Sequence, residues 1–131
     1  MIDWGEHHRE WLERTIGATL EPTAQFLANS EPYGVVGFER YTGDDVEVHV
    51  AGERGFLTRR FLRALAHYAF NDLGCARVTG RVPEFRPASL DVGLRLGFRH
   101  EGTLRRAHKG ADFHILGMLR EECRWLPQDR P

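Results

Sequence analysis

The amino-acid sequence predicts an α+β domain in which a central mixed, mostly antiparallel sheet is flanked by helices. One observation is the order of the local patterns, which runs helix, three strands, helix, strand, helix, two strands. A second is the length of the connections. Short turns join the first three strands and favour antiparallel pairing, whereas the strand–helix–strand unit over residues 46–82 requires a parallel crossover. We therefore expect one sheet of six to seven strands.

Size and composition are those of one globular domain. The chain has 131 residues, of which 41% are hydrophobic and 28% are charged, and a domain of this size can bury one core without a disulfide or a metal. We expect residues 1–131 to form a single domain with a flexible tail at 126–131. Cys75 and Cys123 are far apart in the sequence, and we expect both to be reduced thiols.

Charge and hydropathy exclude some classes of protein. The net charge of -1 argues against a protein that coats nucleic acid through bulk charge. No apolar run approaches the ~20 residues that are needed to span a bilayer. The first residues lack the basic and apolar regions of a signal peptide. The expectation is a cytoplasmic protein that does not enter a membrane.

The N-terminal third of the chain predicts one helix and two strands. Residues 5–16 place apolar side chains on one helical face and Glu and Arg on the other. Strands are expected over 24–28 and 33–41, on either side of a turn at 29–32 that ends in proline.

The next strand carries two chemically different faces. Val46, Val48 and Val50 alternate with Glu47 and His49, which is the period-2 pattern of a half-buried strand. Glu47 and His49 therefore project from the face opposite the valines.

The remainder of the chain alternates helices and strands. Residues 57–72 form the strongest helical pattern, which Gly74 ends, and a strand follows over 76–82. A second helix is expected over 87–96, with proline at its first position and Gly97 after its last. Two more strands are expected over 98–105 and 113–120.

The junction after Val50 has the features of an anion site. A loop with Gly52 and Gly55 opens a long helix, so free backbone N–H groups and the positive end of the helix dipole meet there. Arg54, Arg59 and Arg60 add positive charge that disfavours the helix start by ~0.3–1 kcal/mol each unless an anion binds. The alternative is that these arginines point into solvent or pair with the neighbouring glutamate.

This strand, loop and helix resemble motif A of the GNAT superfamily of N-acetyltransferases, whose loop holds the pyrophosphate of acetyl-CoA. Gly55 matches the central glycine of the motif, Arg/Gln-x-x-Gly-x-Gly/Ala, whereas Gly52 and Leu57 depart from its first and last positions. The resemblance implies the GNAT fold, with acetyl-CoA as co-substrate and an amine as acceptor.

The C-terminal half strengthens the resemblance. Ala88-Ser89 followed by Leu96-Gly97-Phe98-Arg99-His100-Glu101-Gly102 is similar to a signature of ribosomal-protein N-acetyltransferases. Residues 54–62 and 116–125 resemble a short branch often encoded by phages and prophages. The likeness spans 33–125.

The resemblance also implies where the cofactor binds. In this superfamily the strand before the loop splays from its parallel neighbour, and the pantetheine arm inserts into the gap. The implied contacts are backbone groups of the strand and the residues of the loop, together with an arginine that stands where many members have asparagine: Val48, Val50, Ala51, Arg54, Gly55, Phe56, Leu57, Thr58, Arg59 and Arg86.

Candidates for proton transfer lie beside the same gap. His49, whose unperturbed pKa is about 6.5, and Glu47 share a face of their strand, and Glu39 lies on the adjacent strand. The alternatives are a solvated strand glutamate and a structural histidine. Gly93 stands where many members carry a tyrosine that protonates the leaving thiolate.

No metal site is expected, because the seven histidines and two cysteines show no ligand spacing. His7 and His8 are expected on the surface.

Three functions compete at this stage. The first is an N-acetyltransferase whose protein or small-molecule amine acceptor attacks the thioester directly. The second is a non-catalytic CoA-binding or interaction module, which Gly93 and the altered motif favour. The third is a phage-encoded modifier of a host protein or nucleic acid, for which the basic residues of the C-terminal half would have to share one face. The exposed strand edges of so small a domain are compatible with a homodimer.

Overall fold

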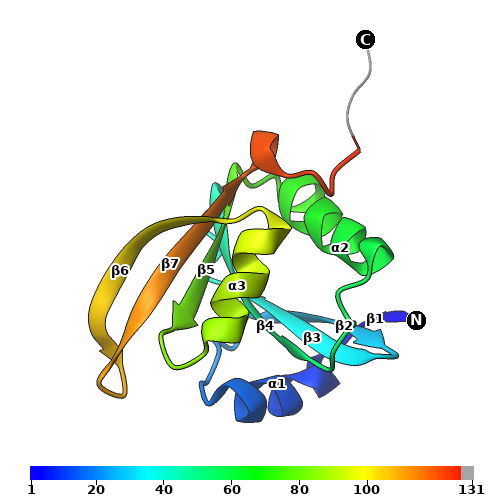
Figure 1. Cartoon of the computed structure of the whole chain (residues 1–131). Helices are drawn as coiled ribbons and strands as arrows, with labels where there is room; N and C mark the ends of the chain where they lie inside the picture. Colours follow the sequence, from blue (N-terminus) through cyan, green and yellow to red (C-terminus); the bar gives the residue numbers. More distant parts are fainter. Residues whose placement is uncertain (128–131) are drawn as a thin grey trace.

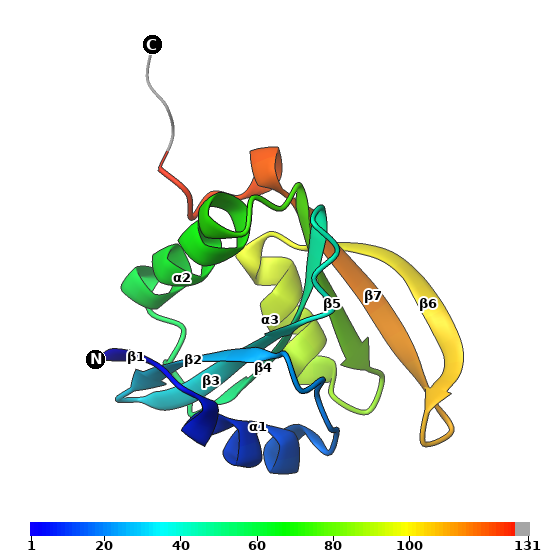
Figure 2. The same cartoon turned by 180° about the vertical axis from the view of Figure 1, so that it is seen from behind.

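The computed structural model describes residues 1–127, which form one seven-stranded mixed sheet with helices on both faces (Figures 1 and 2). The strand order is β1-β2-β3-β4-β5-β7-β6, and every neighbouring pair is antiparallel except β4 and β5. The strands are β1 (Ile2–Trp4), β2 (Gln25–Ser30), β3 (Tyr33–Glu39), β4 (Asp45–Gly52), β5 (Arg77–Pro83), β6 (Arg99–His108) and β7 (Ala111–Leu119). The helices are α1 (Arg9–Ile16), α2 (Arg59–Ala66) and α3 (Pro87–Leu96), with short helical turns η1 (Glu6–His8), η2 (His67–Asp72) and η3 (Arg120–Glu122).

The predicted α+β class and mixed sheet are confirmed, and most elements fall where the patterns placed them. Three differences have physical reasons. Strand β1 was missed because three residues are too short to show a period. The helix predicted over 57–72 begins at Arg59, after Thr58 caps it, and its last six residues are a π-helix. Leu126, at the start of the expected tail, packs against the core, while 128–131 lie outside the described residues.

Two hydrophobic clusters cover the two faces of the sheet. On one face, α1 packs Leu12 against Phe26 and Val35; on the other, α2 packs Phe61 against strand residues that include Val36. Because side chains alternate along a strand, Val35 and Val36 of β3 pack into the clusters on opposite faces of the sheet. Among the described residues, no helix is long and apolar enough to cross a membrane.

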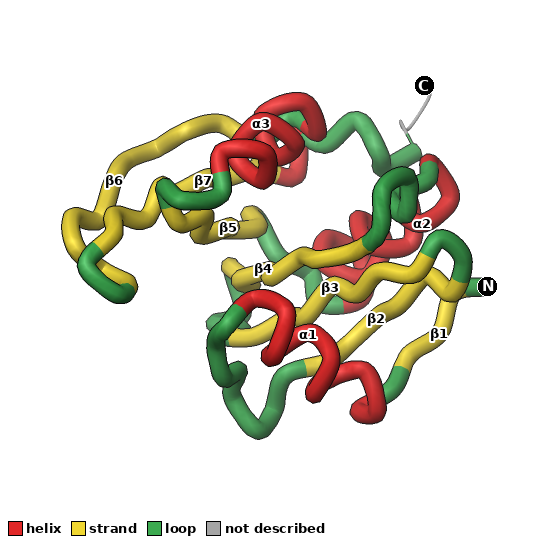
Figure 3. The backbone as a smooth tube through the Cα atoms, turned by 60° about the horizontal axis from the view of Figure 1, so that its bottom comes forward, coloured by secondary structure: helices red, strands yellow, loops and turns green. Residues whose placement is uncertain are grey.

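The sheet opens between its two parallel strands. Residues Asp45–Val48 of β4 pair with Arg77–Gly80 of β5, and no pairing between these strands continues beyond them in the described chain. The rest of β4 pairs with β3 as far as Gly52, and the rest of β5 pairs with β7 as far as Pro83. Figure 3 shows the two strands diverging, with α3 beyond the opening. This splay is the feature that the resemblance to the GNAT superfamily implied.

One aromatic side chain anchors the loop at the end of β4. The Phe56 ring is buried and lies across the paired residues Gly34 and Gly52. A Cβ atom at Gly34 would lie 1.9 Å from the ring, and one at Gly52 would lie 2.5 Å from it. Both glycines are therefore needed for the loop to pack onto the end of the sheet.

Replacement of Gly34 by alanine tests this packing. We expect G34A to push the Phe56 ring out of place and to lower the free energy of unfolding by about 1–3 kcal/mol, the usual cost of an overpacked core. Urea denaturation measures the change. Gly102→Ala is the control, because a Cβ atom there meets nothing within 4 Å; equal effects of the two substitutions would contradict the assignment.

Candidate active site

The loop between β4 and α2 ends in a capped helix start. Gly55 has a φ of 86°, a backbone conformation that favours glycine. Thr58 is the N-cap, and its hydroxyl oxygen accepts a hydrogen bond from the Phe61 N–H at 3.2 Å. The Phe56 carbonyl accepts from the Thr58 N–H and, at 2.9 Å, from the amide of the buried Asn29. Asn29 was missed in the sequence, where it was interpreted only as part of a turn.

Several backbone donors of this loop have no partner within residues 1–127. In the described chain, no acceptor is found for the N–H groups of Arg54, Gly55, Leu57, Arg59 and Arg60. The first turn of a helix always leaves such donors, and here they coincide with the positive end of the α2 dipole. Of the loop contacts implied by the sequence, Phe56 and Thr58 have their N–H groups bonded internally, so they shape the loop.

The arginines of the loop are free to meet an anion. Arg54, Arg59 and Arg60 are exposed, and within residues 1–127 none of them forms an ion pair. The carboxylate of Glu53, their expected alternative partner, instead accepts a hydrogen bond from the Tyr33 N–H at 3.1 Å. Three guanidinium groups and a helix start therefore face solvent without a counter-ion from the described chain.

The strand edge at the opening is equally free. Beyond Val48, the edge of β4 that faces β5 carries no ladder hydrogen bonds in the described residues. Val50 is 42% exposed, although it lies in the middle of a sheet. The strand contacts implied by the sequence, Val48, Val50 and Ala51, all border this opening.

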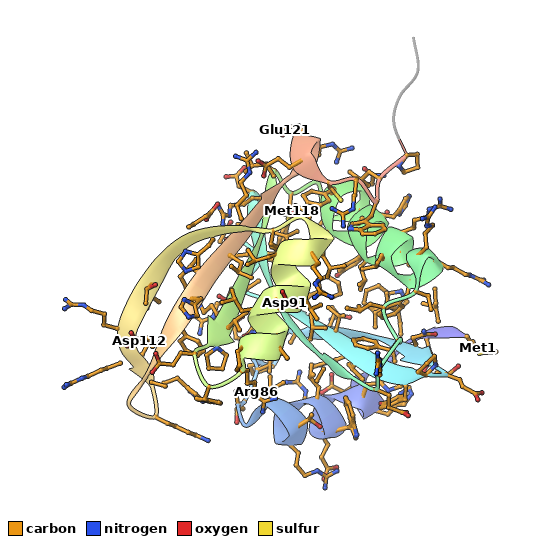
Figure 4. The ribbon with its side chains drawn as sticks, viewed as in Figure 1. Met1, Arg86, Asp91, Asp112, Met118 and Glu121 are labelled. Carbon is orange, nitrogen blue, oxygen red and sulfur yellow. The ribbon has the colours of Figure 1, made fainter. Side chains whose placement is uncertain are left out.

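Two other predicted positions lie elsewhere. The Arg86 guanidinium donates to the Thr15 carbonyl at 3.0 Å, so it joins the start of α3 to the end of α1 (Figure 4). Contact between Arg86 and the cofactor stays a prediction, because in this structure its guanidinium is bonded to Thr15 instead. Gly93 packs against β7, where a Cβ atom would lie 2.7 Å from the Leu116 side chain. Position 93 therefore faces the sheet, which accounts for glycine in place of the usual tyrosine.

The three proposed proton-transfer residues form a cluster on the α1 face of the sheet. The β3–β4 register places Glu39 opposite Glu47 and brings His49 next to both. His49 Nε2 lies 2.6 Å from Glu39 Oε2 and 3.3 Å from Glu47 Oε2. Glu39 and Glu47 are buried, and His49 is half-buried. We call these three residues the carboxylate–histidine cluster.

Two arginines complete this cluster. Arg81 Nε donates to Glu47 Oε1 at 2.6 Å, and Arg40 Nε lies 3.3 Å from Glu47 Oε2. Arg81 stands on β5 two residues after the partner of Glu47, so it projects from the same face of the sheet. Neither arginine was predicted as part of the site: Arg81 reaches Glu47 through the pairing of strands 34 residues apart, and Arg40 follows β3 across the short connection to β4. The buried charges of the cluster are thus compensated by neighbours.

The charges of the cluster set its protonation. Burial alone would lower the pKa of His49, but the hydrogen bond to Glu47 and the charges of Glu39 and Glu47 outweigh it and raise the pKa above 6.5. Burial alone would raise the pKa of Glu47, but His49 and Arg81 lower it below 4.5. At neutral pH the cluster therefore holds ionised Glu47 beside a histidine that retains its proton more strongly than usual.

The position of His49 relates the cluster to the opening. His49 is the first residue of β4 beyond its parallel pairing with β5. A depression of about 750 Å³ borders the other side of the cluster, where Glu39, Glu47 and Arg81 line it together with residues at the paired start of β4 such as Asp45. The sheet opening thus has unpaired N–H donors and arginines at the loop after β4, and the titratable His49 where the two strands part.

Comparison with solved structures finds the same fold among acetyltransferases. A crystal structure described as an acetyltransferase matches with a TM-score of 0.68 and 22% identity, over 78% of this chain and 60% of that one. A protein from T. thermophilus, also described as an acetyltransferase, matches with a TM-score of 0.67 and 22% identity, over 88% of this chain and 66% of that one. A variant of the spermidine N-acetyltransferase SpeG from Vibrio cholerae matches with a TM-score of 0.64 and 14% identity, over 86% of this chain and 73% of that one.

These likenesses confirm the expected GNAT fold. The chain spans less than two thirds of the length of two of these structures. No protein-family model matches the sequence, and no curated protein matches it.

Replacement of His49 by glutamine tests the electrostatics of the cluster. The raised pKa of His49 stabilises the folded protein fully below the unfolded value of about 6.5, and this contribution is lost as pH rises through the folded value. We expect H49Q to lower the free energy of unfolding by about 1.5–3 kcal/mol at pH 6, the range for hydrogen bonds to charged groups, and by less at pH 9. Urea denaturation at both pH values measures this.

The control is His67→Gln, which removes an exposed histidine that lies 3.4 Å from a single carboxylate. A destabilisation by H49Q that is the same at pH 6 and pH 9 would show that His49 is held by packing alone.

Proposed function

We propose that this protein is an N-acetyltransferase that moves an acetyl group from acetyl-CoA to an amine of a protein or small-molecule acceptor. One observation carries the proposal: the sheet opens directly after Val48, with unpaired anion-binding groups at one end and His49 at its base. The shared fold of acetyltransferases supports the same reaction class.

The chain has groups that suit each part of acetyl-CoA, which supplies an acetyl group activated as a thioester. The free N–H groups of the loop, the start of α2 and the side chains of Arg54, Arg59 and Arg60 would hold the pyrophosphate. The unpaired edge of β4 near Val50 offers hydrogen bonds to the amide groups of the pantetheine arm. The same edge supplies the donors available to an oxygen that gains negative charge during transfer.

His49 is the proposed general base. An acceptor amine reaches the site mainly as an ammonium ion, and neutral His49 would take its proton directly or through a water molecule. Glu39 and Glu47 stabilise the resulting imidazolium, and Arg81 holds Glu47 in place.

Transfer of the acetyl group needs no side chain of the protein as an acid for the leaving thiolate. The amine nitrogen forms a bond to the acetyl carbon as the carbon–sulfur bond breaks; the nitrogen then releases its second proton to solvent, and the thiolate takes one proton from solvent. Position 93 supplies no proton, because it is a glycine packed on β7.

The acceptor is proposed only as a class. The likeness of residues 54–62 and 116–125 to phage-encoded proteins makes host proteins the first acceptors to screen, with polyamines and other small amines next. A cytoplasmic location is part of this proposal. The second candidate, a CoA-binding module without turnover, is favoured by Gly93.

Binding of acetyl-CoA is the first test. We expect calorimetry to show one site in the wild type and a roughly tenfold or greater loss of affinity in Arg59→Glu, since a charge-assisted hydrogen bond is worth about 1.5–3 kcal/mol. Arg63→Glu is the matched control, because Arg63 is also exposed on α2 but lies outside its first turn. No binding to the wild type, or equal losses in both variants, would refute the cofactor site.

Turnover is the second test, and it separates an enzyme from a binding module. With an amine panel and detection of released thiol, we expect His49→Gln to lower kcat/KM by about 10²-fold or more while acetyl-CoA affinity stays unchanged. In the wild type, the rate should rise with pH with a midpoint above 6.5, since only neutral His49 accepts a proton. Binding without turnover on any amine would support the module, and full activity of H49Q would reject His49 as the base.

A further inference from the structure

A second cluster of ligating side chains lies at the N-terminal end of the fold, on β1 and η1. Asp3 Oδ2 is 3.0 Å from His7 Nε2 and 2.8 Å from His8 Nε2. The three ligand atoms all lie within 4.8 Å of one another. His8 was expected on the surface but is buried, while His7 and Asp3 reach solvent.

We propose that Asp3, His7 and His8 form a binding site for one divalent transition-metal ion of the zinc type. Two imidazole nitrogens and one carboxylate oxygen are ligands that zinc accepts, and a solvent molecule would take the fourth position. The spacing of the histidines in the sequence predicted no metal site, because the third ligand comes from a strand that was not recognised.

The surroundings orient both histidines. His8 Nδ1 lies 2.8 Å from the hydroxyl of Tyr33. When His8 Nδ1–H donates to that oxygen, the Nε2 lone pair is directed at the ion, and such a second partner usually fixes a metal-bound histidine. The His7 ring folds over Gly5, where a Cβ atom would lie 2.1 Å from the ring. Gly5 has an extended backbone (φ 170°) that any residue adopts. Glycine at this position is therefore explained by the space that the His7 ring occupies and not by backbone conformation.

The spacing of the three ligand atoms is close to that of a zinc site. Ligands about 2.0–2.1 Å from a tetrahedral zinc ion lie about 3.3 Å from one another. The observed separations from Asp3 of 2.8 and 3.0 Å are slightly shorter, and the exposed side chains of Asp3 and His7 are free to open by this amount.

Charge favours this cluster over the second group of carboxylates and histidine found in residues 1–127. Glu39, Glu47 and His49 are also close together, but Arg81 and Arg40 already neutralise Glu47. Among residues 1–127, no arginine or lysine pairs with Asp3. A bound cation would therefore meet an uncompensated carboxylate at Asp3.

A bound ion would add a connection between elements that already contact one another. It would connect β1 to η1 and, through His8, to Tyr33 at the start of β3. The Tyr33 carbonyl in turn accepts from the Glu53 N–H at 2.8 Å. We therefore expect the ion to stabilise the α1 half of the protein.

Titration of tag-free protein with zinc chloride tests the proposal. We expect calorimetry to give one ion per chain and a raised melting temperature. Cobalt chloride should give the intense visible bands of tetrahedral cobalt. Asp3→Asn and His7→Gln should each weaken zinc binding by about tenfold or more, and Tyr33→Phe, which removes only the hydroxyl, by about tenfold.

Gly5→Ala is the sharpest variant, because it changes no ligand. It should displace the His7 ring and weaken zinc binding several-fold, while thermal unfolding of the metal-free protein stays unchanged. His67→Gln is the control and should bind zinc as the wild type does. Absence of zinc binding, or zinc binding that D3N, H7Q and G5A leave unchanged, would overturn the proposal, as would loss of binding in His49→Gln alone.

Discussion

The parting of β4 from β5 is the constraint on which the candidate site depends. Their parallel ladder has four residue pairs, after which each strand belongs to a different antiparallel ladder. Phe56 lies across Gly34 and Gly52 and holds the end of β4 onto β3. Because both antiparallel ladders continue, the twist of the two half-sheets carries the strands apart. The free backbone edge that results must bond to solvent or to a ligand.

Side chains of β4 alternate between the two faces of the sheet, so the two sides of the opening differ in chemistry. Val48 packs against the cluster that α2 covers, and Val50, two residues further along β4, projects from the same face. Glu47 and His49 face α1, where buried carboxylates and arginines compensate one another, and in the described chain no buried side-chain polar atom lacks a partner. One strand thereby separates the groups that suit an anionic cofactor from those that suit a cationic amine.

Many features of the fold could be predicted because they are encoded locally. Period-2 and helical patterns placed most of the strands and all three helices, and proline at the start of α3 and glycine after it marked its ends. The pair Glu47 and His49 could be assigned to one face by counting along β4. Strand β1 could not be found, since three residues carry no periodic signal. The hydrogen bond from the Asn29 amide to the Phe56 carbonyl could not be predicted either, because asparagine shortly before a proline is typical of a turn and its partner lies 27 residues away.

The sequence by itself determined the class of fold, the glycine-containing loop before α2 with its three arginines, and the alternation of valines with Glu47 and His49 along β4, because spacing, caps and turn residues act between neighbours in the chain. Only the tertiary structure decided which of these residues meet. It joined Arg81 to Glu47 through 34 positions of sequence separation, turned Arg86 toward α1, and brought Asp3 to His7 and His8. The physical reason is that such contacts depend on strand register and sheet twist, which are set by pairing between distant segments.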